Sequence, residues 1–148
     1  MFKSLLIGLV LIFSLHVNVF AEVSKTDDDA KVEKAFNQMK RAYRGEDLKS
    51  FFRNVSENKF QKDFLEFFDD VQEDLQKHDI LSLDIWVDKI TTDKKARFLY
   101  VTWSKRYIST QSNIEINKDG KSMFLFVKTK KRYKLVDYGG DVLFGDTE

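Results

Sequence analysis

Few side chains in this sequence have the types and spacing that chemistry requires. His78 is the only histidine after residue 21, and the chain contains no cysteine. Zinc sites are built from several histidine, cysteine or carboxylate ligands, so we expect no metal site and no cofactor. The sequence also shows no phosphate-binding loop, nucleophile elbow or Ser-His-Asp set. Motifs alone therefore give little support for catalysis.

The segment RFLYVTWSKRY, residues 97–107, combines aromatic and basic side chains. Such a mixture suits a nucleic-acid platform, a pocket wall or an ordinary strand. Alternation gives one face of this segment the residues Arg97, Leu99, Val101, Trp103, Lys105 and Tyr107. Without the first 21 residues, which include Lys3, the chain has equal numbers of acidic and basic residues. Such a chain has no net charge to attract a polyanion such as nucleic acid. We interpret the segment as a central strand and expect no nucleic-acid partner.

The first 21 residues have the pattern of a secretory signal peptide. Lys3 supplies a positive charge, residues 5–13 are apolar, and Ala21 precedes the expected cleavage site. The apolar run is shorter than the roughly 20 residues that span a bilayer. We expect cleavage after Ala21, no transmembrane anchor afterwards, and a periplasmic or secreted mature chain.

The mature chain is expected to begin with a short lead-in and a helix. Residues 22–30 are polar and predict a flexible lead-in, with one of the aspartates at 27–29 capping the helix. Apolar residues at spacings of three and four predict that helix over residues 32–43. Gly45 is expected to end it in a left-handed conformation.

Two further helices are expected before the sheet. Asp47 can cap a short helix over residues 48–55, and Ser56 is expected to open a longer one that reaches Leu75. The longer helix carries many acidic residues: Asp63, Glu66, Asp69, Asp70, Glu73 and Asp74. Their spacing does not match an EF-hand loop, so we interpret them as a solvated face.

The hydrophobic period changes from 3.6 to 2 after His78, which predicts strands. Strands are expected at residues 81–87, 96–107, 114–116, 122–128 and 133–138, with a hairpin turn at 118–120. Helices followed by an antiparallel meander indicate an α+β domain over residues 31–148, with N-terminal helices packed on a curved sheet that forms a cone.

Two segments resemble the nuclear transport factor 2-like superfamily, also called the cystatin-like cone fold. Residues 42–48, AYRGEDL, followed by Phe51 and Phe52, are similar to the glycine-acidic turn that ends its first helix and to the short helix after that turn. Residues 133–137, YKLVD, are similar to the aromatic-Lys-Leu pattern of its last strand. The phenylalanine-rich helix in place of an early strand resembles uncharacterised exported branches more than the enzyme branches. The superfamily includes isomerases, dehydratases, ligand binders and assembly domains, so the fold alone does not give a function.

The resemblance implies a site inside the cone. Enzyme branches place a tyrosine or histidine beside an aspartate, where the pair can move a proton next to a carbonyl group. Here that pair would be Tyr43 with Asp84 or Asp88, provided that the strand face bearing Trp86 turns inward. Leu83 and Ile85 belong to the more apolar face, so alternation favours an outward position for both aspartates. His78 lies near the C-terminus of a helix, where we expect it to have a structural role through the helix dipole.

We therefore expect a non-enzymatic binding domain that holds a small apolar ligand or a segment of an envelope protein. The residues expected to line its aromatic pocket are Phe36, Tyr43, Tyr100, Trp103 and Tyr138. An isomerase- or dehydratase-like enzyme and a structural homodimer through the open sheet face are the alternatives. A basic run at a hairpin, Lys128, Lys130, Lys131, Arg132 and Lys134, is a solvated turn or a contact for an acidic partner or anionic lipid.

Overall fold

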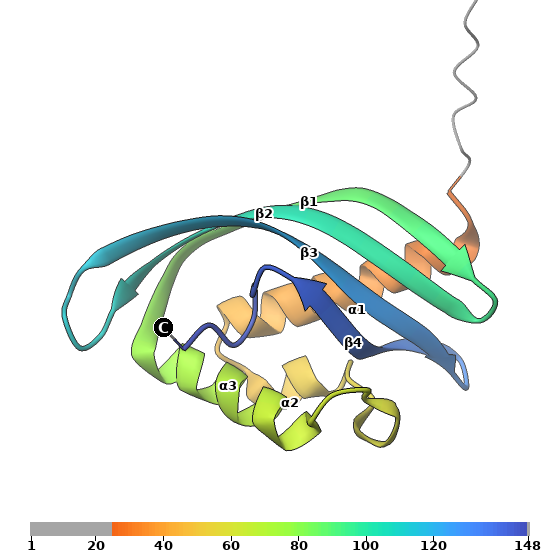
Figure 1. Ribbon diagram of the computed structural model, residues 1–148, viewed down its shortest axis with the longest axis horizontal. Coiled ribbons are helices and arrows are strands. Elements are labelled where there is room, and N and C mark those ends of the chain that lie inside the picture. Colours follow the sequence, from red (N-terminus) through yellow and green to blue (C-terminus); the bar gives the residue numbers. More distant parts are fainter. Residues whose placement is uncertain (1–24, 148) are drawn as a thin grey trace, which may run out of the picture.

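The computed structural model describes residues 25–147, and it shows a curved sheet with the helices beneath its concave face (Figure 1). The helical elements are α1 (Asp27–Arg44), α2 (Leu48–Phe52), the 3-10 turn η1 (Glu57–Lys59) and α3 (Phe64–Lys77). The strands are β1 (His78–Asp93), β2 (Ala96–Ser109), β3 (Glu115–Thr129) and β4 (Arg132–Gly140). The predicted α+β plan is confirmed. The predicted signal peptide lies outside the described residues.

The sheet is an antiparallel meander in the order β1-β2-β3-β4. The β1–β2 register shifts twice, at Ile80/Ser82 and at Val87/Lys89, and bulges of this kind bend and twist a strand. The curved sheet can then wrap over α1, as Figure 1 shows. The β4 edge is covered by the chain after α2, since Ser56 N donates to Leu135 O at 2.9 Å. None of the helices in residues 25–147 is long and apolar enough to cross a membrane.

The first helix begins earlier than its apolar spacing predicted. Thr26 accepts a hydrogen bond from Asp29 N, and Asp29 accepts one from Thr26 N, which forms a capping box. The cap is therefore a hydroxyl rather than an aspartate, and residues 27–30 are helical rather than a flexible lead-in. Gly45 has φ of −90°, and the left-handed residue is Glu46, with φ of 55°. Asp47 caps α2 as predicted, accepting from Ser50 N at 2.9 Å.

The prediction of a single helix from Ser56 to residue 75 is wrong. The chain makes only η1 after Ser56, and α3 starts at Phe64 because Asp63 caps it, accepting from Leu65 N and Glu66 N. Phe60 stacks on Phe67 with ring centroids 5.1 Å apart, so the loop packs against the helix instead of continuing it. The long helix that resembled the exported branches is therefore two elements separated by a loop.

The predicted hairpin at residues 118–120 is also wrong, because β3 runs unbroken through it. Gly120 pairs with Trp103 across the β2–β3 ladder, and the indole ring lies over it. A Cβ atom on Gly120 would be 2.4 Å from Trp103 Cζ2, so glycine here makes room for a ring rather than a turn. The β2–β3 connection lies instead at residues 110–114, where Asn113 has φ of 54°.

The segment after β4 closes the space between the sheet and the helices. Leu143 and Phe144 are buried in the core, and Asp141 N donates to Lys121 O at 2.9 Å. Trp103 Nε1 donates to Ser122 Oγ, whose hydroxyl in turn donates to Asp141 O at 2.6 Å. The last described residues are therefore part of the core rather than a loose tail.

Replacing Gly120 with alanine should destabilise the fold. The new methyl group would overlap the Trp103 ring and the Asp141 Cβ, and overpacking of this kind costs about 1–3 kcal/mol of unfolding free energy. Gly139→Ala is the matched control, because its Cβ would meet only Met123 Cε, at 3.7 Å. Urea unfolding should show the loss for Gly120→Ala alone. Equal stability of the two variants would contradict this packing.

Candidate functional site

The interior of the cone is filled. Phe36, Tyr43 and Trp103, three of the residues predicted to line a pocket, are at most 2% exposed. The Phe144 ring occupies the centre, with its centroid 4.9 Å from that of Tyr43 and 5.1 Å from that of Phe51. These side chains pack on one another instead of surrounding a space for a ligand.

The other two predicted pocket residues lie elsewhere. Tyr100 is on the convex face of β2, where Lys89 Nζ sits 4.7 Å from its ring centroid. Tyr138 is half-buried, packs on Phe67 at 4.9 Å, and lies beneath Lys62. The structure therefore does not bring all five rings together: three are in the core, Tyr138 packs against the core from its margin, and Tyr100 lies on the convex face.

The predicted pair of Tyr43 with Asp84 or Asp88 does not form. Both aspartates are exposed on the outer face of β1, with the exposed Trp86 between them. Asp88 accepts a hydrogen bond from Thr102 Oγ1 at 2.8 Å. Tyr43 is fully buried on the other side of the sheet, so no proton can pass between these groups.

Tyr43 meets a different carboxylate, that of Asp74 on α3. Asp74 is fully buried and accepts a hydrogen bond from the Tyr43 hydroxyl. The other groups around the carboxylate are His78 Nδ1 at 2.8 Å, Lys105 Nζ at 3.2 and 3.3 Å, Gly145 N at 3.0 Å and Asp146 N at 3.3 Å. We call this set the Asp74 cluster. It ties α1, α3, the start of β1, β2 and the C-terminal segment together.

Burial sets the electrostatics of the Asp74 cluster. It lowers the pKa of Lys105, an effect that the Asp74 carboxylate opposes. It raises the pKa of Tyr43, and the Asp74 charge raises that pKa further. Lys105 also donates to the Tyr43 hydroxyl. Each member has a partner and none reaches solvent, so the cluster is suited to holding elements together rather than to acting on a substrate.

Sequence reasoning missed the Asp74 cluster, although a signal was present. Asp74 was counted with the solvated acidic face, but it stands three residues after Val71 and seven after Phe67, on the apolar stripe of α3. Lys105 interrupts the apolar face of β2 in the same way. A charged residue at a buried position calls for a partner. His78 has the structural role predicted for it, although it acts through Asp74. Residues 25–147 contain no grouping of three or more His, Asp or Glu that would hold a metal.

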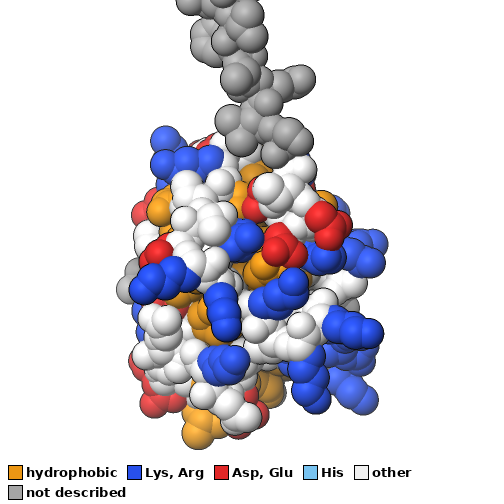
Figure 2. Space-filling view, turned by 90° about the vertical axis from the view of Figure 1, so that its right-hand side faces the viewer, with side chains coloured by type: hydrophobic (Ala, Val, Ile, Leu, Met, Phe, Trp, Pro, Cys, Tyr) orange, Lys and Arg blue, Asp and Glu red, His pale blue; other side chains and the backbone are white. Residues whose placement is uncertain are grey.

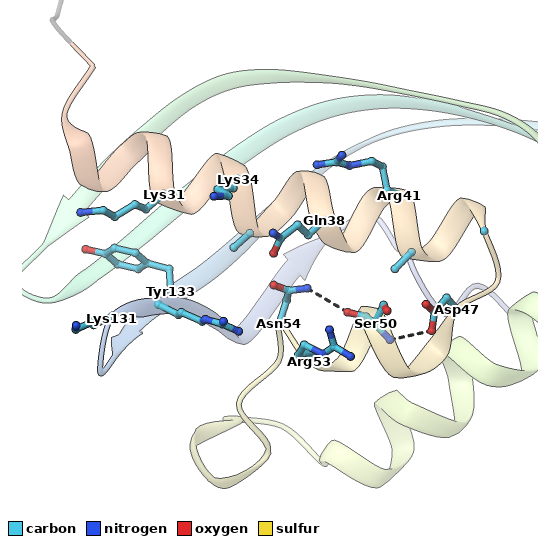
Figure 3. Close-up of a pocket in the computed structure, with 14 residues that line it drawn as sticks. Lys31, Lys34, Gln38, Arg41, Asp47, Ser50, Arg53, Asn54, Lys131 and Tyr133 are labelled. Atoms are coloured by element: carbon cyan, nitrogen blue, oxygen red, sulfur yellow. Dashed lines mark hydrogen bonds between the residues drawn. The ribbon is translucent and has the colours of Figure 1, made fainter.

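The surface carries a groove of about 900 Å³ between α1, α2 and the β3–β4 hairpin (Figure 3). Lys31, Lys34 and Gln38 lie along α1, and Ser50, Arg53 and Asn54 lie on the opposite side. Its lining is Lys31, Lys34, Ala35, Gln38, Arg41, Ala42, Gly45, Asp47, Ser50, Arg53, Asn54, Lys131, Arg132 and Tyr133. We call it the basic groove.

Positive charge dominates the basic groove. Six of its lining residues are lysine or arginine and one, Asp47, is acidic and occupied as the α2 cap. Lys31 is paired with Asp27. Within the described part of the chain, the other five cations, Lys34, Arg41, Arg53, Lys131 and Arg132, form no ion pair and are exposed. Figure 2 shows lysine and arginine side chains gathered over the end of the molecule where the β3–β4 hairpin lies.

The floor of the basic groove is made of small and uncharged residues. Ala35 and Ala42 lie about two turns apart on the floor side of α1, and Gly45 follows at the end of the helix. Gln38 is exposed between them on α1, and on the α2 side of the groove Asn54 Nδ2 donates to Ser50 O at 3.1 Å. Small side chains allow a bound backbone to approach closely, and the amides offer it hydrogen bonds.

Comparison with known proteins identifies the fold. No family model and no curated protein matches the sequence. A nuclear transport factor 2-like protein from Shewanella oneidensis superposes with a TM-score of 0.59 at 12% identity, over 76% of this chain and 98% of that chain. The chain has the nuclear transport factor 2-like fold. A superfamily protein from Salmonella enterica matches with a TM-score of 0.59 at 11% identity, over 80% of this chain and 94% of that chain.

The nuclear transport factor 2-like fold is shared by proteins of different kinds. A ketosteroid isomerase-like protein from Erwinia carotovora matches with a TM-score of 0.62 at 10% identity, over 76% of this chain and 94% of that chain. Identity at this level shows the fold alone, so the function has to be argued from the sites of this chain.

Tyr43→Phe should destabilise the protein in a pH-dependent way. The change removes a hydroxyl that bonds to Asp74 and Lys105, and hydrogen bonds to charged groups contribute about 1.5–3 kcal/mol. A tyrosine whose pKa is raised by folding contributes fully below about pH 10, and this contribution falls as the pH rises further. The difference in unfolding free energy between the parent and Tyr43→Phe should therefore shrink above pH 10.

Urea unfolding at pH 8 and across pH 9.5–11 measures this difference. Tyr100→Phe is the matched control, since its ring lies on the convex face outside the Asp74 cluster, and it should change stability by less than about 0.5 kcal/mol. If the loss of unfolding free energy in Tyr43→Phe grew with pH, it would show that the Asp74 cluster does not hold Tyr43 protonated.

Proposed function

We propose that this chain is an exported, non-enzymatic binding domain that holds an acidic segment of a partner protein in the basic groove. The observation that supports this function is the charge of the groove, where five exposed cations stand outside any ion pair in the described part of the chain and the one aspartate of the lining caps α2. The packing of the aromatic side chains inside the cone, where Phe144 contacts Tyr43, favours the surface groove over an internal site for a small apolar ligand.

Electrostatics favours an acidic partner. A single exposed ion pair contributes up to about 1 kcal/mol, and it weakens with salt because the screening length is about 8 Å at physiological ionic strength. Five exposed cations around a concave surface act together on one ligand. The full chain has a formal net charge of only +1, which gives little long-range attraction, so the attraction is local to the groove.

The other lining groups favour a polypeptide over a nucleic acid. Gln38 and Asn54 present amide groups that can bond to a peptide backbone. Single-stranded nucleic acid is held by bases stacked on exposed aromatic rings. Tyr133, the one aromatic residue of the lining, is buried and offers no such platform.

Reversing one charge in the basic groove should weaken binding of an acidic peptide. Lys34→Glu and Arg53→Glu each remove one attraction and add one repulsion. In each variant the two effects should reduce the binding free energy by about 1–2 kcal/mol, so the affinity for a fluorescein-labelled hexaglutamate should fall about tenfold. Fluorescence anisotropy at 0.15 M salt measures this. Lys95→Glu, at the exposed β1–β2 turn, is the matched control and should bind like the parent. An equal loss in all three variants would mean that only general charge attracts the peptide.

Export has its support in the N-terminal sequence pattern, with Lys3, the apolar run and Ala21 before Glu22. The full chain expressed in a Gram-negative bacterium should be recovered from the periplasm or the medium with Glu22 as its first residue. Intact-mass measurement and N-terminal sequencing check this. Recovery from the cytoplasm with residues 1–21 still attached would contradict export.

A further inference from the structure

The shape of the basic groove indicates the conformation of its ligand, and this inference rests on the proposed function. We infer that the acidic segment binds in an extended conformation, that about six of its residues lie in the groove, and that acidic residues follow one another directly in its sequence.

The length of the groove matches a short extended segment. Its α1 wall runs from Lys31 to Gly45, which is roughly 21 Å at 1.5 Å per helical residue. Six residues of extended chain span roughly 20 Å. The same length of helix would need fourteen or so residues and a channel about 10–12 Å wide. Six extended residues therefore fill the groove from the β3–β4 hairpin to the turn before α2.

The two walls of the groove explain why the acidic residues should be consecutive. Lys31 and Lys34 stand on α1, whereas Arg53 and Lys131 stand on the opposite side and at the hairpin end (Figure 3). An extended chain directs successive side chains to opposite sides, so a run of acidic residues meets both walls. A helix with carboxylates on one face meets one wall and turns its remaining side chains toward the other.

The uncharged residues of the groove point to the same conformation. A helix bonds its own backbone groups internally, whereas an extended chain leaves its N–H and C=O groups to be satisfied by the binding surface. Gln38 is exposed on the α1 side, and Ser50 and Asn54 face it from the α2 side. Ala35 and Ala42 leave the floor low enough for a backbone to pass.

Four labelled ligands test the inference against the full mature chain. One peptide carries six consecutive glutamates, and a second alternates six glutamates with serine, which puts its carboxylates on one side of an extended chain. A third is a stapled, alanine-rich helix with six glutamates at spacings of three and four. The fourth ligand is a six-nucleotide oligothymidylate. Anisotropy titrations compare them on the parent chain, Lys34→Glu, Arg53→Glu and the Lys95→Glu control.

We expect the consecutive peptide to bind at least tenfold more tightly than the helix and several-fold more tightly than the alternating peptide. Lys34→Glu and Arg53→Glu should each reduce the affinity for the consecutive peptide about tenfold. A peptide shortened to three glutamates should bind the parent chain about tenfold more weakly. Equal or tighter binding of the helix would overturn the extended conformation but leave the proposed function standing. Absence of binding by every peptide would overturn the proposed function itself. Oligothymidylate binding as tightly as the best peptide would overturn the protein partner.

Discussion

The buried carboxylate of Asp74 is the constraint on which the rest of this fold depends. A carboxylate removed from water costs several kcal/mol unless charge and hydrogen bonds replace its hydration. Asp74 obtains them from five groups, on Tyr43, Lys105, His78 and the backbone of residues 145 and 146. These groups belong to segments far apart in the sequence. The carboxylate is satisfied only when α1, β2 and the C-terminal segment are all in place.

This requirement explains why the cone is closed. The Gly145 and Asp146 amides reach Asp74 only if the chain after β4 turns back over the helices, and that path places Phe144 among the rings of Phe36, Tyr43 and Phe51. The space between the helices and the sheet is then occupied by the chain itself. The proposed binding function therefore uses the outside of the molecule.

Helix α1 links the interior to the basic groove. One face buries Val32, Phe36, Met39 and Tyr43 against the sheet, and Tyr43 anchors that face to Asp74. The adjacent face carries Lys31, Lys34 and Gln38 along the groove. The same contacts that fix α1 in the core thus hold one wall of the groove in place without help from the ligand, which lowers the cost of binding.

Local patterns predicted the class of fold well, because hydrophobic period, helix caps and alternation are short-range properties. The helix from Val32, the Asp47 cap and the strand at residues 97–107 are examples. Contacts between distant segments could not be predicted in this way. Gly120 was interpreted as a turn because its partner, Trp103, comes from another strand. The groove combines residues near 31–41, 47–54 and 131–133, and only its basic hairpin was visible in the sequence.

Backbone amide chemical shifts, recorded by NMR during titration with a peptide of consecutive glutamates, distinguish binding in the basic groove from binding in the cone. Binding in the groove should change the shifts along the groove face of α1, at residues 50–54 and at residues 129–133, and leave those of Asp74 and Lys105 unchanged. Changes centred on Asp74, Lys105 and the C-terminal segment would instead place the ligand in the cone and overturn binding in the groove.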